Sequence, residues 1–332
     1  MRWILPEYVE DILPAEAARI EALRRKILDL FFSKQFELVI PPLLEYMDSL
    51  LTGAGHDLDV RTFKVVDQMS GKMMGVRADM TPQVARIDAH LLNRKGITRL
   101  CYCGSVLHTR PRSPGATREP IQIGAEIYGE AGVAADLEIL RLLCDALKLT
   151  GARGARIDIG HVAVFRALAL EAKVGADLEA ELFEALQKKD APAIASLTRK
   201  LPAKTRDALN LLPQLYGGPE VLDLAEKQLP KIEALQQALK TLRALSKACS
   251  IPASFDLAEL RGYHYHSGVV FDAYCDAVSG AVARGGRYDD AGKAFGRARP
   301  ATGFSIDLRS LAALGGASKK AVSKKRQRPL TA

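Results

Sequence analysis

The 332-residue sequence contains no apolar run near the roughly 18 residues that a transmembrane helix needs. Its first residues, MRWILPEYVEDILP, carry acids and prolines where a secretory signal peptide has an apolar segment. The five cysteines are an odd number and include no Cys-x-x-Cys pair, which argues against a disulfide framework and favours buried, reduced thiols. These absences predict a cytoplasmic protein with no membrane partner.

Acidic residues are missing from the C-terminus. The chain carries a net charge of +8, but six of its basic residues lie in the last 15 positions, SKKAVSKKRQRPLTA, which contain no acid. The rest of the chain carries only about +2, which is too little for a nucleic-acid-binding surface. We expect residues 315–332 to form a disordered basic tail, and a weak anion-binding or solubilising arm is the alternative. A nucleic-acid binder that uses this tail is a further interpretation, against which the near-neutral charge of the rest of the chain argues.

The order of predicted elements contains no βαβ dinucleotide-binding unit. Residues 16–35 have apolar side chains at helical spacing, and residues 61–82 read as a hairpin that turns at Ser70-Gly71. A further helix is expected over 85–94 and another in ADLEILRLLCDAL. Strands are expected in RLCYCGSVLHT, REPIQIGAEIYGE, ARIDIGHVAVF, SFDLAEL, GVVFDAY, AVARGGRY and PATGFSIDL.

Composition changes in the middle of the chain. Residues 166–248 are rich in Ala, Leu, Lys and Glu with helical periodicity, and we expect an all-helical insertion there. It would divide a core into a first part, residues 1–165, and a second part, residues 249–314. The whole pattern predicts an α+β fold in which a largely antiparallel sheet is flanked by helices.

The glycine-rich stretch GGRYDDAGKAFG lacks the spacing of a phosphate-binding loop. Five residues separate Gly286 from Gly292, where that motif needs four, and Ala294 follows Lys293 where the motif has Ser or Thr. A turn that lines a small-molecule pocket is the better interpretation.

A polar stripe runs along the apolar segment IQIGAEIYG. Gln122, Gly124 and Glu126 fall on one face of this strand, and the isoleucines fall largely on the other. Buried polar groups are costly unless they are paired, and the small Gly124 leaves space between its neighbours. The stripe therefore indicates a ligand site.

Two further stretches concentrate polar side chains. RADMTPQVARI places Arg77, Asp79 and Thr81 on one face at the end of a strand, with an exposed sheet face as the alternative. In RGYHYHSGVVF, His264 and His266 alternate and share one face of an expected strand. No Cys or His partner has zinc-site spacing, so we expect hydrogen bonding in a core or pocket and no metal site.

Together these segments resemble class II histidyl-tRNA synthetases, in the right order across residues 1–314. PLLEYMD resembles motif 1, the dimer-forming strand, and IQIGAEIYG the strand that closes motif 2. RADMTP resembles the Arg-Pro-Glu-Gly-Thr loop of that family, with Asp79 in place of its Glu. LRGYHYHSGVVFDAY resembles the Arg-Gly-Leu-Asp-Tyr-Tyr signature of that family. GGRYDD resembles its glycine loop, and ATGFSIDL resembles the start of its motif 3. The resemblance implies a class II synthetase-like fold and a homodimer formed through the motif 1 strand.

The departures from that family lie where it binds ATP. Motif 2 has Phe-Arg-x-Glu, but here His108 takes the place of the Arg and Arg110 that of the acid, and a register shift of one restores nothing. Motif 3 ends Gly-Leu-Glu-Arg, but here Asp307 replaces the Gly and Ser310 the Arg. Two lost phosphate contacts, each about 2–5 kcal/mol if charged and buried, imply that ATP is not activated. No anticodon-binding domain follows motif 3, so tRNA is not an expected partner.

The amino-acid side of the resemblance is better preserved. It implies that Asp79 meets the ammonium group of a free L-histidine, Arg261 its carboxylate, and Tyr265 and His266 its imidazole end. The full set of implied histidine-binding residues is Asp79, Thr81, Gln122, Glu126, Arg261, Tyr265 and His266.

The combination of a preserved histidine pocket with lost ATP contacts is similar to that of the ATP phosphoribosyltransferase regulatory subunits, a family related to histidyl-tRNA synthetases. Such chains bind the short catalytic subunit of the first enzyme of histidine biosynthesis, are needed for its activity and convey feedback inhibition by histidine. The resemblance implies no catalytic residue and no cofactor. A divergent histidine-activating, aminoacyl-adenylate-forming enzyme is the alternative. The docking surface, the subunit ratio and the share of the inhibition that this chain carries stay open.

Overall fold

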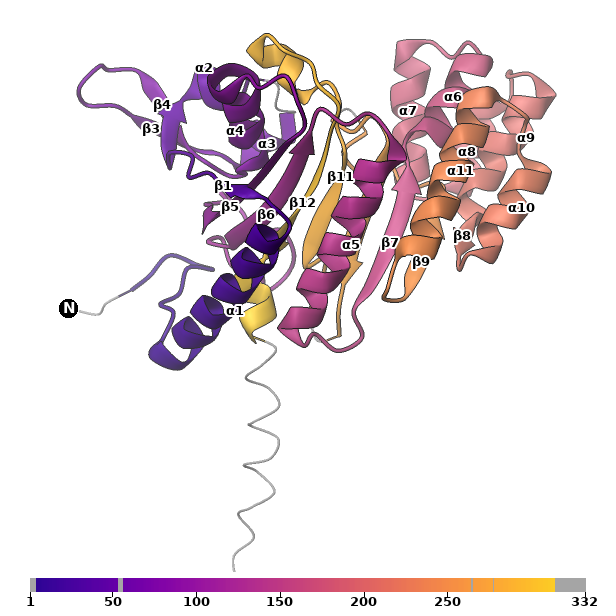
Figure 1. Cartoon of the computed structure of the whole chain (residues 1–332). Coiled ribbons are helices and arrows are strands. Elements are labelled where there is room, and N and C mark those ends of the chain that lie inside the picture. The colour runs from indigo at the N-terminus through magenta and orange to yellow at the C-terminus, as the bar shows by residue number, and fades with distance from the viewer. Residues whose placement is uncertain (1–3, 53–55, 264, 277, 314–332) are drawn as a thin grey trace, which may run out of the picture.

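The computed structural model describes residues 4–52, 56–263, 265–276 and 278–313, and Figure 1 shows their arrangement. The predicted tail over 315–332 and His264 lie outside the described residues. Within the described ranges, twelve strands form two sheets. The larger sheet has nine strands in the order β1 (Glu37–Leu38), β5 (Thr98–Ser105), β6 (Ile121–Tyr128), β12 (Ala301–Asp307), β11 (Ala283–Arg287), β10 (Val269–Tyr274), β7 (Arg156–His161), β9 (Ala253–Asp256) and β8 (Tyr216–Gly217).

The nine-stranded sheet is largely antiparallel, as predicted. Among the strands of the described residues, only the pairs β1–β5 and β7–β9 run parallel. Helices α1 (Pro14–Ser33) and α5 (Val133–Thr150) cover one face of the sheet (Figure 1). The apolar residues Ile123 and Ile127 of β6 join the core beneath these helices. The alternation along this strand therefore places the polar stripe of β6 on the opposite face, which we call the site face.

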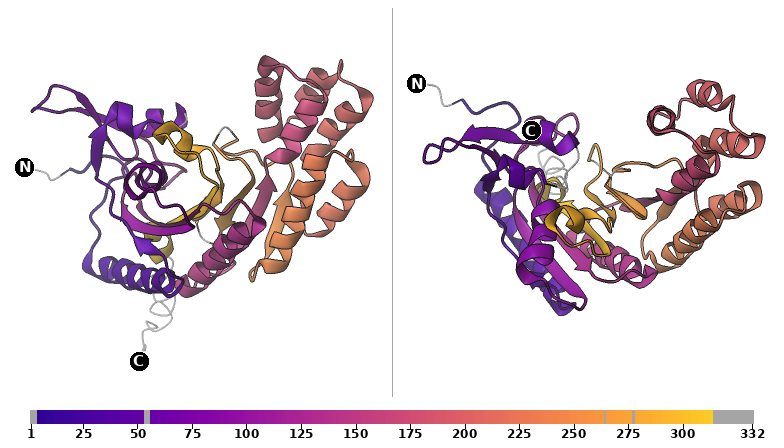
Figure 2. Two further views of the ribbon diagram at one scale, coloured as in Figure 1. Left: turned by 45° about the horizontal axis from the view of Figure 1, so that its top comes forward. Right: turned by 90° about the horizontal axis from the view of Figure 1, so that it is seen from above.

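Six helices gather beside β7 and β9, at one end of the sheet (Figures 1 and 2). They are α6 (Ala163–Glu171), α7 (Ala176–Gln187), α8 (Ala191–Thr198), α9 (Ala203–Leu211), α10 (Glu220–Gln228) and α11 (Glu233–Ala248), with the 3₁₀ turn η2 (Leu212–Gln214). The expected all-helical segment also contributes the short strand β8, which pairs with β9 beside the Gly217-Gly218 break. The division into a core and an insertion stays a prediction.

A smaller sheet lies over the other end of the site face (Figure 1). It consists of β2 (Leu44–Tyr46), β4 (Met73–Val76) and β3 (Phe63–Val66), and the short helices nearby are α2 (Met47–Leu50), α3 (His56–Arg61), α4 (Thr81–Arg86), the π-helix η1 (Ile87–Leu92) and the 3₁₀ helix η3 (Ala291–Phe295). Gly71, with φ +71°, forms the turn between β3 and β4, so the predicted hairpin is confirmed.

Residues 261–263 and 265–268 form turns, and β10 begins only at Val269, so the expectation of a strand from Arg261 onward is wrong. The reason is local: Gly262 takes φ +63°, and the backbone N–H groups of Tyr265 and His266 donate to its carbonyl oxygen at 2.8 and 2.7 Å. A turn of this kind brings neighbouring side chains to the same region, whereas a strand would alternate them. No helix in the described part of the chain is long and apolar enough to cross a membrane.

Candidate functional site

The register of the central strands opens a space on the site face. Gly124 and Glu126 of β6 lie opposite Ser305 and Gly303 of β12, and Tyr102 of β5 lies opposite Gly124 on the other side. A Cβ atom at Gly303 would overlap the Glu126 carboxylate, and one at Gly124 would overlap the Tyr102 hydroxyl. The two glycines therefore make room for these two polar side chains above the sheet.

Glu126 lies at the centre of the site and is almost completely buried. Its Oε1 accepts a hydrogen bond from the Tyr102 hydroxyl at 2.9 Å, and its Oε2 accepts one from the Tyr288 hydroxyl. Burial raises the pKa of the Glu126 carboxyl to about 8, because desolvation outweighs the two tyrosine hydrogen bonds. A carboxyl in this state can meet an N–H donor or a cation that enters the site.

Asp79 provides the second acidic group. Its Oδ1 accepts from the Gln122 side-chain amide at 2.9 Å and from the Thr81 backbone N–H at 3.0 Å. Burial acts to raise the pKa of Asp79, but the nearby positive charge of Arg112 and these hydrogen bonds lower it overall. Asp79 is therefore held as a carboxylate, suited to an ammonium group.

One hydroxyl connects the two acids. The Tyr102 hydroxyl, which donates to Glu126, lies 3.0 Å from Thr81 Oγ1, and Thr81 follows Asp79 at the start of α4. Gln122 joins the same network through Asp79. The structure thus brings together four of the predicted residues: Asp79 from the segment before α4, Thr81 from the start of α4, and Gln122 and Glu126 from β6.

Tyr265 and His266 reach this network from the turn before β10. The Tyr265 ring stacks on Tyr288, with centroids 5.0 Å apart and planes at 24°, and contacts the His266 ring edge to face at 5.4 Å. The buried Tyr265 hydroxyl has no hydrogen-bond partner among the described residues. His266 Nδ1 lies 3.2 Å from the Arg287 carbonyl oxygen, and burial lowers the pKa of its imidazole to about 4, so this ring is neutral at neutral pH.

Arg261, the seventh predicted residue, is not part of the network. Its guanidinium donates to the Asp272 carboxylate and, at 3.1 Å, to the Tyr274 hydroxyl. Both partners belong to β10, and the Arg261 side chain is 53% exposed. Arg261 is therefore held against β10 from the preceding turn, and among the described contacts it makes none with Asp79 or Glu126.

Of the two positions that depart from motif 2, one is buried in the fold and the other is exposed. The His108 side chain is fully buried, and its Nε2 lies 2.9 Å from the Ala78 carbonyl oxygen. Burial lowers the pKa of this imidazole to about 4, so the ring carries no charge at neutral pH. Arg110 is exposed.

The positions that depart from motif 3 also make internal contacts. The Asp307 carboxylate accepts from the Arg309 backbone N–H at 3.0 Å and from the Ser310 hydroxyl at 2.5 Å. The Arg309 guanidinium donates to Thr117 Oγ1 at 3.2 Å and to the Glu10 carbonyl oxygen at 3.1 Å. Asp307 and Ser310 cap the helical residues 308–313 that follow β12, and Arg309 fastens the N-terminal segment.

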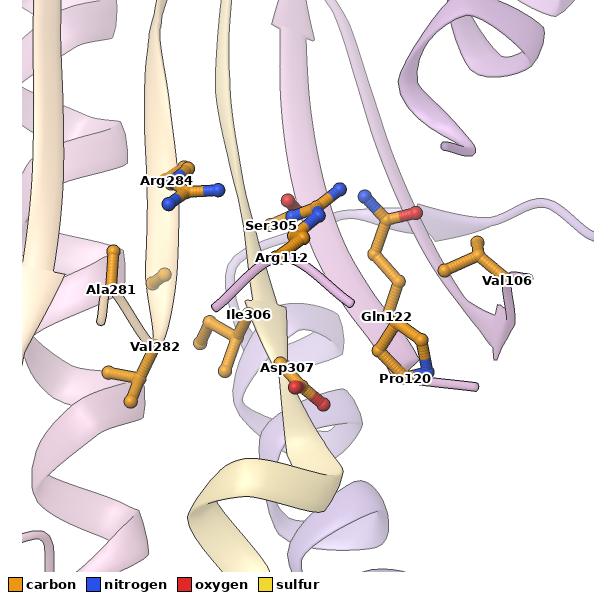
Figure 3. Close-up of a pocket in the computed structure, with 11 residues that line it drawn as sticks. Val106, Arg112, Pro120, Gln122, Ala281, Val282, Arg284, Ser305, Ile306 and Asp307 are labelled. Carbon is orange, nitrogen blue, oxygen red and sulfur yellow. The ribbon is translucent and has the colours of Figure 1, made fainter. Parts of the chain in front are cut away.

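Sequence reasoning missed four residues that shape the site. Tyr102 and Tyr288 come from β5 and from the end of β11, and only the strand order brings them to Glu126. Arg112 and Arg284 line a pocket beside Gln122 (Figure 3). The GGRYDD stretch was a usable signal for Tyr288, but no periodicity marks Arg112, which lies in the loop between β5 and β6. Within the described ranges, no cluster of three His, Cys, Asp or Glu side chains could hold a metal ion.

Comparison with known proteins places this geometry in a family. The family model for histidyl-tRNA synthetase matches residues 8–311. The ATP phosphoribosyltransferase regulatory subunit of Ralstonia nicotianae is 60% identical over 313 residues, which cover 94% of this chain and 81% of the relative. The protein of the same name from Thiobacillus denitrificans is 59% identical over 317 residues, which cover 95% of this chain and 99% of the relative.

A solved structure agrees with these relatives. A Bacillus halodurans protein described as an ATP phosphoribosyltransferase regulatory subunit/histidyl-tRNA synthetase superposes with a TM-score of 0.84 at 26% identity, over 94% of this chain and 82% of its own. The predicted α+β, class II synthetase-like fold is thereby confirmed. The chain belongs to the family of ATP phosphoribosyltransferase regulatory subunits, which share the fold of histidyl-tRNA synthetase.

Proposed function

We propose that this chain is the non-catalytic regulatory subunit of an ATP phosphoribosyltransferase that performs the first step of L-histidine biosynthesis, in the cytoplasm. It would bind a short catalytic subunit, which needs it for activity, and convey feedback inhibition by L-histidine. The observation that carries the proposal is the 59–60% identity to curated regulatory subunits along almost the whole chain.

The chemistry of the site supports L-histidine as the ligand. Glu126, held by two tyrosines on the site face, is suited to an imidazole N–H. Asp79, which Gln122 and Thr81 keep ionised and oriented, is suited to an α-ammonium group. The aromatic ring of Tyr265 and its unpartnered hydroxyl would lie against the imidazole, with the neutral His266 ring beside it.

The contacts of the motif positions support a non-catalytic role. Phosphate binding in a synthetase depends on charged side chains aimed at the ligand, but His108 is buried against Ala78 and Ser310 is bonded to Asp307. Histidine-dependent ATP–pyrophosphate exchange would instead identify the alternative, an aminoacyl-adenylate-forming enzyme.

The exposed apolar residues around β2 support the proposed homodimer. Leu43, just before β2, and Leu44 and Tyr46 on it are 50%, 42% and 44% exposed, and neighbouring exposed apolar side chains of this size are typical of interaction sites. A second copy of the chain on the motif 1 strand would cover them. Within this proposal tRNA has no role.

The test is reconstitution with the short catalytic subunit. The two chains are co-purified, and phosphoribosyl transfer from phosphoribosyl pyrophosphate to ATP is assayed with each chain alone and with the complex. We expect activity only from the complex, inhibition by L-histidine, and no ATP–pyrophosphate exchange by this chain alone. A catalytic subunit that is equally active alone, or measurable exchange, would refute the proposal.

A further inference from the structure

The pocket beside Gln122 contains two arginines that lie close to the candidate histidine site. Arg112 comes from the loop between β5 and β6, and Arg284 from β11, and both face the same space as Gln122 and Ser305 (Figure 3). The pocket has about 30 Å³ of free volume, which is room for roughly one or two waters or for a group of similar size. It is therefore a subsite for a small polar group.

Arg112 has no partner of its own. The Arg112 side chain is exposed, and among the described residues its guanidinium makes no hydrogen bond and no ion pair. Desolvation lowers the pKa of Arg112 to about 10, and the positive charges of Arg61 and Arg284 act in the same direction, against the charge of Asp79. An anion in the pocket would therefore meet a guanidinium that has no competing partner among the described residues.

Arg284 is also incompletely satisfied. Its Nε is buried and has no hydrogen bond among the described residues. Asp272, at 3.6 Å from that Nε, is engaged by the guanidinium of Arg261 and the hydroxyl of Tyr274. Ser305 lies directly opposite Arg284 in the sheet register, so it faces the same pocket. Two guanidiniums and a hydroxyl thus offer donors to whatever enters.

The carboxylate of Asp79 lies near these donors but forms no ion pair with Arg112. Asp79 and Arg112 act on each other electrostatically, yet no ion pair within 4.0 Å joins them. Gln122 and Thr81 hold Asp79 from one side, and Arg112 reaches in from a separate loop. The carboxylate of Asp79 and the guanidinium of Arg112 are therefore neighbours that do not form an ion pair with each other. An α-amino acid, which carries an ammonium and a carboxylate on one carbon, can pair with both.

The pocket also contains a feature that selects among anions. The Asp307 carboxylate lines it, although its oxygens accept hydrogen bonds from the helical residues that follow β12. Its charge opposes a polyphosphate, and the small volume does too. A single carboxylate is smaller and carries less negative charge than a polyphosphate, so the pocket opposes it less, and the guanidiniums of Arg112 and Arg284 attract it.

We propose that Arg112 and Arg284 form the subsite for the α-carboxylate of the bound amino acid, and that Arg261 lies outside this subsite. The inference rests on the proposed function, because it assumes that an amino acid occupies the space between Asp79 and Glu126. It assigns the carboxylate to side chains other than the arginine that the sequence suggested.

The experiment uses calorimetric titration of the full chain with L-histidine and with histamine, which keeps the imidazole and the ammonium but lacks the carboxylate. A charged hydrogen bond in a protein corresponds to an affinity ratio of about 10 to 150. The unsubstituted chain is therefore expected to bind L-histidine at least about tenfold more tightly than histamine. Equal affinity for the two ligands would overturn the proposal without any mutation.

Four variants identify the residues. Arg112→Met and Arg284→Met should each reduce the preference for L-histidine about tenfold or more while leaving histamine binding unchanged. Arg261→Met and Arg110→Met, which each remove one positive charge elsewhere, should keep the preference. Loss of the preference in Arg261→Met, with retention in both pocket variants, would overturn the proposal. Thermal unfolding verifies that each variant is folded, and the glutamine variant of the same arginine replaces any methionine variant that is not.

Two further outcomes separate this proposal from others. Inorganic phosphate that competes with L-histidine but not with histamine supports the carboxylate subsite. If phosphate binds at the same time as L-histidine, and only Arg112→Met abolishes phosphate binding, the arginines bind a phosphate ligand. That result would overturn the carboxylate proposal. If the unsubstituted chain binds neither L-histidine nor histamine, the proposed function itself fails, and the carboxylate assignment falls with it.

Discussion

Replacing Glu126 by glutamine removes an ionisable group from the centre of the site while keeping its size and one acceptor oxygen. Both tyrosine hydroxyls can still find a partner, since a hydroxyl both donates and accepts. Alanine would instead leave the buried hydroxyls of Tyr102 and Tyr288 without acceptors, at about 1–3 kcal/mol for each. Glutamine is therefore the informative change, and alanine would mix loss of binding with loss of stability.

The pKa of Glu126 fixes the direction of the pH dependence. Folding raises this pKa from an ordinary 4.5 to about 8, so the folded state holds the proton more tightly than the unfolded state. The associated stability is fully present below pH 4.5 and is lost as the pH rises through 8. At about 1.4 kcal/mol per pH unit, the loss over this window is on the order of 5 kcal/mol.

The measurement is urea unfolding of the original chain and of Glu126→Gln between pH 5 and pH 9. The free energy of unfolding of the original chain, relative to that of the variant, should fall steadily with rising pH. L-Histidine should bind the variant about 10 to 150 times more weakly, because a charged hydrogen bond is lost. Glu138→Gln, on α5 and paired with Arg99, should leave histidine affinity unchanged. A stability difference that is flat with pH would refute the buried-carboxyl argument.

Three other predictions concern Gly303, the stability that ligands add, and the C-terminal tail. Gly303→Ala places a Cβ on the Glu126 carboxylate and should destabilise the fold by about 1–3 kcal/mol in urea unfolding, whereas Gly96→Ala, which meets open space, should not. L-Histidine at about 100 times its Kd should stabilise this chain by roughly 2.7 kcal/mol, and ATP should not; equal thermal shifts would contradict this. Deleting residues 317–332, a segment without apolar periodicity, should leave activation of the catalytic subunit intact, and lost activation would mean that the tail docks.

Local periodicity made much of the fold and part of the site predictable. The spacing of apolar residues indicated α1, which the structure has over Pro14–Ser33. The alternation in β6 separated Gln122 and Glu126 from the isoleucines before any tertiary contact was known. Such patterns are visible in sequence because one face of each element must be buried and the period follows from backbone geometry.

The rest depends on contacts that no local pattern contains. Tyr102 and Tyr288, the partners of Glu126, are 24 and 162 residues away from it in the chain. The turn before β10 follows from the left-handed conformation of Gly262 and two hydrogen bonds to its carbonyl, which override the alternation of Tyr265 and His266. Arg112 lies in a loop with no repeating pattern, so its position beside Asp79 became visible only in three dimensions.

The central claim is that L-histidine inhibits the enzyme complex through the Glu126 site of this chain. The most direct test is the inhibition of phosphoribosyl transfer by L-histidine in complexes assembled with the original chain and with Glu126→Gln. Activation requires only a folded docking surface, whereas inhibition requires histidine binding coupled to the catalytic subunit. We predict that the variant complex stays active and resists L-histidine. A variant complex that is active and fully histidine-sensitive would contradict the claim and move the inhibitory site to the catalytic chain.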